Sequence, residues 1–392
     1  MRAVQEDYYL MDRGRIDLLF CKVKVRAWLS QLQDKSWKLA RTLKYRSESQ
    51  VIGDSPTMLF LYYPNAIAES QLYLFHLHRK ELLKSFGLTF KALPISVLPR
   101  IRVSDPSNLK LIAVQAHFHI EPNDLMDMFD QIKSIGSVAK IIFLDWFATS
   151  DLRLFSTIDP FIDRYVKKTV FTDSDKYRTS YFGDTNLMDY YGRLYKCEHR
   201  QQQYTVPRSV DDKLVAGVGF ISAPYLHSLF SWANFPENER PIDLNARFST
   251  CGSGWYTAMR SAALSKAVAL SANYVVSSGS IPKIKYLEEL GQSKITFSPF
   301  GYGEICWRDY EAMALGSLLI KPDMSHLKVY PDIFIPYETY IPIAWDFSDF
   351  DEKVLHYLNN PKERLRITGN AYEVGHEFVR QRSFIEHVKD LV

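Results

Sequence analysis

Short apolar runs alternate with amphipathic stretches along the first part of the chain. Met58–Tyr63, Leu109–Val114 and Lys140–Leu144 are apolar and rich in β-prone residues, so they predict buried strands. Ala66–Phe86 and Pro122–Ile135 carry apolar residues at helical spacing and predict helices. Strands that alternate with helices at this spacing predict a parallel, Rossmann-like sheet.

The same alternation returns after a segment rich in proline and asparagine. Pro224–Pro241 is the predicted linker. Trp255–Ala272 then predicts a helix. A chain of 392 residues exceeds what one core usually fills, so we expect two domains.

One stretch of the second domain joins a strand, a glycine loop and a helix. Ile295–Pro299 ends an apolar β-prone run, and Gly301-Tyr302-Gly303 lets the backbone turn and approach a ligand where a Cβ would clash. We expect a helix to begin near Glu304. Its first-turn amides and its dipole would favour a phosphate group at that end.

The predicted helix carries charged residues on one face. Glu304, Arg308 and Glu311 stand at i, i+4 and i+7, which favours either a ligand site at the top of a sheet or a surface ladder of ion pairs. Gly316 follows an apolar helix end and occupies a C′ cap position before the strand Ser317–Ile320.

This segment also resembles a known family. Residues 308–320, RDYEAMALGSLLI, look like the R-x-x-E-A-x-A-x-G-x-x-x-I segment in the donor domain of GT-B glycosyltransferases, notably exostosin-like and family-1-like enzymes. The resemblance implies an α/β GT-B fold, in which two Rossmann-like domains face a central cleft and a C-terminal helix crosses back to the N-terminal domain. We therefore expect an acceptor-binding domain over residues 1–235, a nucleotide-sugar donor domain over 240–370, and a terminal helix over 371–392.

The resemblance also implies roles for particular residues. In the family, the glutamate that matches Glu311 holds the ribose hydroxyls, while basic side chains and loop amides hold the diphosphate. Pro241–Phe248 resembles the opening strand of a GT-B donor domain, and Arg247 lies at its end. We prefer Arg247 as a diphosphate ligand to Arg260, which we expect to pair with an acid on its own surface. The predicted donor-binding residues are Arg247, Gly301, Tyr302, Gly303, Glu304, Arg308 and Glu311.

One position departs from the family. Many retaining members carry a glutamate eight positions before the one that matches Glu311, where this chain has Gly303. The nearest acid, Glu304, is seven positions before, so either a retaining or an inverting reaction stays open. Glu304 is then either a sugar ligand or the ion-pair partner of Arg308.

Three residues of the first domain are candidates for a general base. Asp145 and Asp151 follow the strand that ends at Leu144, where the side chains of a parallel sheet point toward a ligand. His119 follows another strand, and His117 two residues earlier shares its face. The alternatives are that the aspartates cap turns or helices and that His119 is a structural histidine.

Composition narrows the class of protein. Net charge is +3, from 48 basic and 45 acidic residues, which gives no reason to expect a nucleic-acid partner. The 4 cysteines are far apart, without a C-x-x-C pair, and fit reduced thiols better than disulfides or zinc. No run approaches a membrane span, so we expect a cytoplasmic protein that is soluble or peripheral to a membrane.

For two segments the sequence is consistent with more than one environment. Ile16–Cys21 predicts a strand, and the basic helix expected at Lys22–Arg46 would either cover a sheet or lie on a membrane surface. Residues 161–205 are rich in Tyr, Lys, Arg and Asp, as in an acceptor-facing or interdomain insert or in a solvated surface.

Together these features predict a glycosyltransferase. It would move a sugar from a nucleotide diphosphate sugar to a hydroxyl of a glycan or lipid-linked glycan. We expect no metal and no other cofactor. The family implies polysaccharide or surface-glycan assembly. The alternatives are a nucleotide-sugar epimerase on the same fold and a non-catalytic sugar- or nucleotide-binding module.

Overall fold

The computed structural model describes residues 50–52, 55–231, 235, 239–381 and 383–391. The strand expected at Ile16–Cys21 and the helix expected at Lys22–Arg46 lie outside these residues. Within the described ranges, no helix has both the length and the apolar character that crossing a bilayer requires.

The first part of the chain builds a parallel sheet with the strand order β11-β7-β6-β5-β2-β3. Its strands are β2 (Thr57–Tyr62), β3 (Thr89–Pro94), β5 (Leu109–Val114), β6 (Lys140–Asp145), β7 (Arg164–Lys167) and β11 (Leu214–Ala216). Every residue of β2 is buried, because helices cover both faces of the sheet. The strands predicted at Met58–Tyr63, Leu109–Val114 and Lys140–Leu144 are confirmed, as is the helix at Pro122–Ile135.

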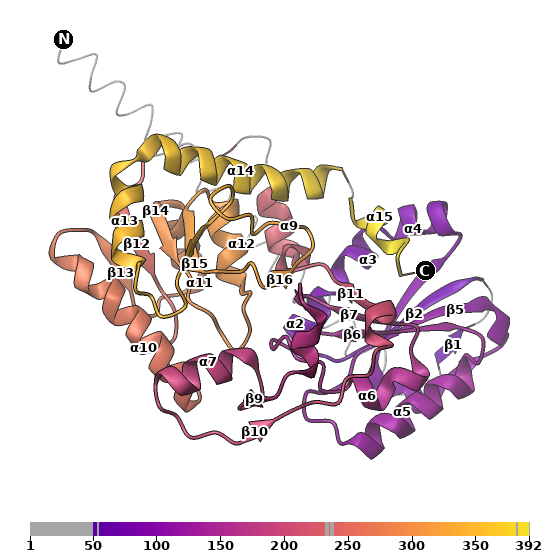
Figure 1. Cartoon of the computed structure of the whole chain (residues 1–392). Helices are drawn as coiled ribbons and strands as arrows, with labels where there is room; N and C mark the ends of the chain where they lie inside the picture. The colour runs from indigo at the N-terminus through magenta and orange to yellow at the C-terminus, as the bar shows by residue number, and fades with distance from the viewer. Residues whose placement is uncertain (1–49, 53–54, 232–234, 236–238, 382, 392) are drawn as a thin grey trace, which may run out of the picture.

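The second sheet is also parallel and has the order β13-β12-β14-β15-β17. Its strands are β12 (Ile242–Ala246), β13 (Val276–Ser278), β14 (Ser293–Phe297), β15 (Leu318–Pro322) and β17 (Ile341–Ile343). The chain thus forms two Rossmann-like units, which Figure 1 shows beside each other.

Helices connect the strands of both sheets. In the first unit they are α2 (Ala66–Ser70), α3 (Tyr73–Leu77), α4 (Arg79–Phe86), α5 (Pro122–Ile135), α6 (Phe155–Ile158), α7 (Asn186–Leu194), α8 (Val210–Lys213) and α9 (Pro224–Phe230). In the second they are α10 (Gly254–Ala269), α11 (Lys283–Gly291), α12 (Trp307–Ala314), α13 (Phe350–Asn359), α14 (Pro361–Arg380) and α15 (Ser383–Val388). The 3-10 helices are η1 (Ile95–Arg100), η2 (Pro106–Asn108), η3 (Asp159–Phe161), η4 (Ser174–Arg178), η5 (Phe220–Ser222) and η6 (Leu270–Ala272).

The helix expected over Ala66–Phe86 is divided into α2, α3 and α4. Gln71, just after α2, donates to the carbonyl of Asp145 at 3.1 Å and accepts from the Gln115 amide at 2.7 Å. These contacts tie the end of α2 to β5 and β6. Gly87 ends α4 with a φ of 66°, as expected of a left-handed C-cap.

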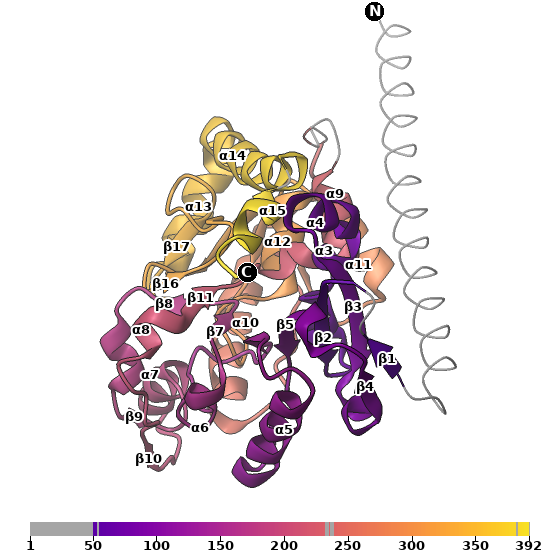
Figure 2. The ribbon, with the colours of Figure 1, turned by 90° about the vertical axis from the view of Figure 1, so that its right-hand side faces the viewer.

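The C-terminal helices connect the second unit back to the first. In Figures 1 and 2, α14 runs across the molecule to α15 beside α3 and α4. The Phe384 ring of α15 lies 4.8 Å from the Phe75 ring, edge to face. This return, together with the two parallel sheets, is the GT-B arrangement that the sequence predicted. α14 is continuous through Gly375, which leaves room for the Phe230 ring, 2.3 Å from where a Cβ would lie.

Short strand pairs complete the fold and link the two units. β1 (Gln50–Ile52) pairs with β4 (Ile101–Val103), and β9 (Tyr181–Phe182) pairs with β10 (Gln201–Gln202). β8 (Val170–Phe171) pairs with β16 (Leu327–Lys328), which belongs to the second unit. The link between units therefore includes backbone hydrogen bonds.

Part of the segment 161–205 lies against the second unit. The Tyr191 hydroxyl of α7 donates to the Trp345 carbonyl at 2.9 Å, and its ring stacks with Trp255 of α10 at 6.3 Å. The interdomain alternative for this segment is therefore confirmed at α7.

Candidate functional site

The candidate site is built around α12, which follows β14 at the carboxyl edge of the second sheet. The helix begins at Trp307, so the start predicted near Glu304 is wrong. Cys306 is extended, with φ −144° and ψ 169°, and its N–H donates to the Asp309 carboxylate at 2.9 Å, which closes the first turn there. Arg308 and Glu311 share a helix face, whereas Glu304 lies before the helix.

The glycine loop, which was expected to contact a ligand, contacts the backbone of the first unit. A Cβ on Gly303 would lie 1.7 Å from the Ala148 carbonyl oxygen, so this glycine allows the two backbones to touch. The Gly301 N–H donates to the Gly303 carbonyl at 2.9 Å. Tyr302 is exposed, and its hydroxyl accepts from the Ser253 N–H at 2.9 Å. At this point the two units are in contact.

Glu304 joins the two units beside that contact. Its carboxylate is buried and accepts from the Ser150 hydroxyl at 2.8 Å and from the Asn186 amide at 2.9 Å, both in the first unit. Burial alone would raise the pKa of Glu304, but His326 at 3.6 Å and the two hydrogen bonds outweigh burial and lower it. Glu304 makes no salt bridge with Arg308 in the described part of the chain.

Glu311 is enclosed by three side chains that sequence reasoning missed. Its carboxylate is 1% exposed and accepts from the Tyr225 hydroxyl at 2.6 Å and from the Lys283 ammonium. Tyr286 lies beside it and is also buried. The three residues come from α9 and α11 and share no motif with residues 308–320, so only the folded chain brings them together.

Arg247 is already paired. Its guanidinium contacts both oxygens of Glu289, at 2.5 Å and 3.1 Å, and also donates to the Ser278 carbonyl. This planar, two-point pairing satisfies its charge. A diphosphate would have to compete with Glu289 for it.

Arg260 has no such partner, contrary to the expectation that it pairs with an acid. It donates to the carbonyls of Phe300, Ser249 and Pro299, at 2.8, 3.1 and 3.5 Å. Burial, and then the like charge of Arg308, lower the pKa of Arg260. Within the described ranges no carboxylate forms a salt bridge with it.

Arg308 is a second cation beside Arg260. It donates to the Arg247 carbonyl at 3.1 Å and lies near the Ser298 hydroxyl at 3.5 Å, again without a salt bridge to a described carboxylate. The guanidinium carbons of Arg260 and Arg308 lie 5.7 and 5.6 Å from the Phe248 ring centre. Two arginines that form no salt bridge with a described carboxylate thus lie beside one aromatic ring at the sheet edge.

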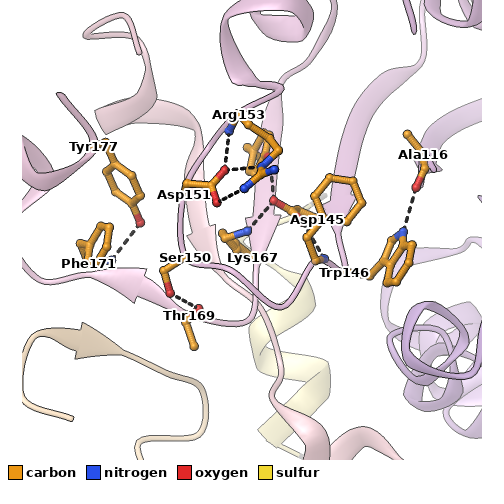
Figure 3. A network of polar contacts seen from close by, with 12 residues as sticks. Ala116, Asp145, Trp146, Ser150, Asp151, Arg153, Lys167, Thr169, Phe171 and Tyr177 are labelled. Carbon is orange, nitrogen blue, oxygen red and sulfur yellow. Dashed lines mark hydrogen bonds and ion pairs between the residues drawn. The ribbon is translucent and has the colours of Figure 1, made fainter. Parts of the chain in front are cut away.

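Figure 3 shows Asp145 held within a polar network of the first unit. It is 1% exposed, and one oxygen accepts from Lys167 at 2.6 Å and from the Tyr165 hydroxyl at 2.7 Å. Its other oxygen accepts from the Phe147 N–H at 2.8 Å, which is the turn-capping alternative. The carboxylate is therefore fully engaged and not presented to an acceptor hydroxyl.

The other two candidate bases have different surroundings. Asp151 is buried and makes a two-point pair with Arg153, at 2.7 and 2.9 Å (Figure 3). Burial would raise the pKa of Asp151, but Arg153 outweighs burial and lowers it, which weakens it as a base. His119 is exposed, and its ring lies 5.7 Å from that of His117.

Comparisons with known proteins give similarity at the level of whole structures. No protein-family model matches the chain, and no curated protein matches it. A glycosyltransferase from Rickettsia africae is 10% identical, with 86% of this chain and 99% of that chain covered and a TM-score of 0.47. Anabaena HepE in complex with UDP and glucose is 9% identical, with 84% and 98% covered and a TM-score of 0.43.

A putative UDP-N-acetylglucosamine 2-epimerase from Listeria monocytogenes is similar to the same degree. It is 11% identical, with 88% of this chain and 98% of that chain covered and a TM-score of 0.41. At such identities and TM-scores, similarity assigns neither an activity nor a ligand to the chain.

Proposed function

We propose that the chain is a glycosyltransferase that moves a sugar from a nucleotide diphosphate sugar to a hydroxyl of a glycan or glycolipid acceptor. The observation that carries the proposal is the pair Arg260 and Arg308, which both lie beside the Phe248 ring and form no salt bridge with a described carboxylate. Arg260 is buried, and a buried cation is costly unless an anion pairs with it. Arg308 is half-buried beside it. A diphosphate supplies the matching charge.

In this proposal three residues of the second unit bind the donor. Glu311 binds the ribose hydroxyls, and Arg260 and Arg308 bind the diphosphate and stabilise the charge that develops as it leaves. Because two guanidinium groups supply this positive charge, we propose that no metal is required. Residues 240–370 would bind the donor and residues 1–235 the acceptor.

Of the three predicted bases, His119 has the exposed ring that an incoming acceptor can reach, so an inverting reaction would use His119. A retaining reaction needs no such base. Polysaccharide or surface-glycan assembly in the cytoplasm is the setting that the family resemblance implies.

The test is a panel of nucleotide diphosphate sugars, with and without oligosaccharide and lipid-linked acceptors. We expect at least one donor to raise the melting temperature and to be consumed with release of the nucleoside diphosphate. Glu311→Gln and Arg308→Met are expected to abolish both effects, and treatment with EDTA is expected to change neither. A donor converted to a rearranged sugar would indicate an epimerase instead, and a donor bound but never consumed would indicate a binding module. If no donor binds, the proposal fails.

A further inference from the structure

The carboxylate of Glu311 is covered by a lysine that can move. Glu311 itself is 1% exposed, whereas the side chain of Lys283 is 45% exposed. Lys283 lies in the first turn of α11, and a lysine side chain is a flexible stem that carries a strongly hydrated charge. When the ammonium leaves Glu311, it regains water at little cost.

Two tyrosines flank this lysine. Its ammonium lies 5.2 Å from the centre of the Tyr225 ring and 5.0 Å from the centre of the Tyr286 ring. Tyr225 also donates its hydroxyl to Glu311, so the carboxylate keeps one hydrogen bond even when Lys283 moves away. The site therefore has a fixed partner and an exchangeable one.

Tyr286 has a hydroxyl group without a well-aligned partner among the described residues. Its oxygen is buried and meets no partner in hydrogen-bond geometry, although it lies close enough to Glu311 to be influenced by that carboxylate. Burial, and then the charge of Glu311, raise the pKa of Tyr286, so the hydroxyl keeps its proton. An unsatisfied buried hydroxyl beside a carboxylate is costly, and a polar ligand would satisfy it.

We propose that Lys283 is the exchangeable partner of Glu311: the vicinal hydroxyls of a ligand replace it on the carboxylate, and Lys283 then pairs with a phosphate of the same ligand. This inference rests on the proposed function and assigns a further residue to the recognition of its ligand. When the ligand carries both hydroxyls and a phosphate, Lys283 exchanges its ion pair with Glu311 for one with the phosphate. An uncharged nucleoside also displaces the lysine but offers it no new ion pair. The site selects nucleoside diphosphates over nucleosides.

The test compares Lys283→Met with wild type in calorimetric titrations of uridine, adenosine and guanosine and of their diphosphates. Methionine keeps the apolar stem between the tyrosines and removes the charge. For the base that wild type binds, we expect diphosphate affinity to fall about tenfold or more, as for loss of one charged contact, with nucleoside affinity unchanged or higher. Lys285→Met, at an exposed position of the same helix, is the matched control and should leave both affinities unchanged.

Each outcome decides one point. Lys283→Arg restores a charge and should recover most of the preference for the diphosphate. Equal losses of nucleoside and diphosphate affinity in Lys283→Met would mean that the lysine only supports the fold, which overturns this inference while the proposed function stands. If wild type binds none of the diphosphates, the proposed function fails and this inference fails with it.

Discussion

Two adjacent lysines at the end of β7 have opposite electrostatic surroundings. Lys167 forms a buried ion pair with Asp145 at 2.6 Å. Lys168 is also buried, but its ammonium contacts only the Ile67 carbonyl, at 3.4 Å, and the Phe220 ring, at 4.5 Å, among the described residues. Burial lowers the pKa of Lys168 to about 7, with Asp145 opposing the shift and Lys167 adding to it.

This low pKa predicts a stability that depends on pH. The unfolded chain holds the Lys168 proton up to a pKa of about 10.4, so between pH 7 and that value it binds more protons than the folded chain. The cost of burying the charge is therefore fully present below pH 7 and disappears as the pH rises. Lys168→Met should raise the melting temperature at pH 6 and raise it much less at pH 9.

The control for this experiment is Lys84→Met on the exposed side of α4. It should shift the melting temperature by the same small amount at both pH values. A Lys168→Met protein that is equally destabilised at pH 6 and pH 9 would show that the lysine stabilises the fold in its charged form.

The arginines of the candidate site give a second prediction at this scale. Arg260→Met should weaken nucleoside diphosphate binding by about tenfold to a hundredfold, because it removes a guanidinium group that would form charged hydrogen bonds with the diphosphate. Arg247→Met should have a much smaller effect, since Glu289 already holds that guanidinium. Calorimetric titration measures both, and comparable losses would contradict this division of roles.

At the scale of elements, the sequence predicted the existence of α12 correctly but not the residue at which it begins. The strand, the helix and the Gly316 cap were predicted because each depends on local periodicity and local turn preferences. The start of the helix was misplaced because it depends on Cys306, an unusual cap residue, and on its contact with Asp309.

Contacts between distant elements could not be predicted in the same way. The sequence favoured Arg247 over Arg260 as a diphosphate ligand, and only the folded chain places Glu289 beside Arg247. Likewise, Gly303 was correctly singled out as a point of close approach, but the approaching group is the Ala148 backbone. The sequence indicates which glycine or arginine is a candidate for a close contact, but only the folded structure identifies the group that it contacts.

The cap of α12 can be tested against a glycine inside a helix. Gly316 has a φ of 70°, and a Cβ there would lie 2.6 Å from the Arg240 guanidinium, so Gly316→Ala should cost about 1–3 kcal/mol of unfolding free energy. Gly369, inside α14, has nothing within 4 Å of the place where a Cβ would lie, and Gly369→Ala should gain about 0.5–1 kcal/mol. Urea denaturation measures both, and a neutral Gly316→Ala would contradict the strain argument.

At the scale of the molecule, the contact between Gly303 and Ala148 holds the two units together beside Glu304. Gly303→Ala would place a methyl group 1.7 Å from the Ala148 oxygen, so the two backbones must separate there. The hydrogen bonds from Ser150 and Asn186 to Glu304 would lengthen with them. We expect a larger radius of gyration in small-angle X-ray scattering and faster proteolysis between the units.

Gly254→Ala is the control, because no atom lies within 4 Å of its Cβ position. It should leave the scattering profile unchanged. A Gly303→Ala protein with the wild-type profile would mean that the loop can shift without separating the units.

The return of α15 to the first unit also determines the order in which the chain can fold during synthesis. Phe384, Val388 and Leu391 are buried, and Phe384 and Leu391 line an apolar pocket with Leu74 and Leu144 of the first unit. While the ribosome makes the second unit, that apolar surface has no cover. The first unit therefore completes its core only after residue 391 has left the ribosome, and a truncated chain that ends at Arg380 would present the uncovered surface to chaperones and proteases.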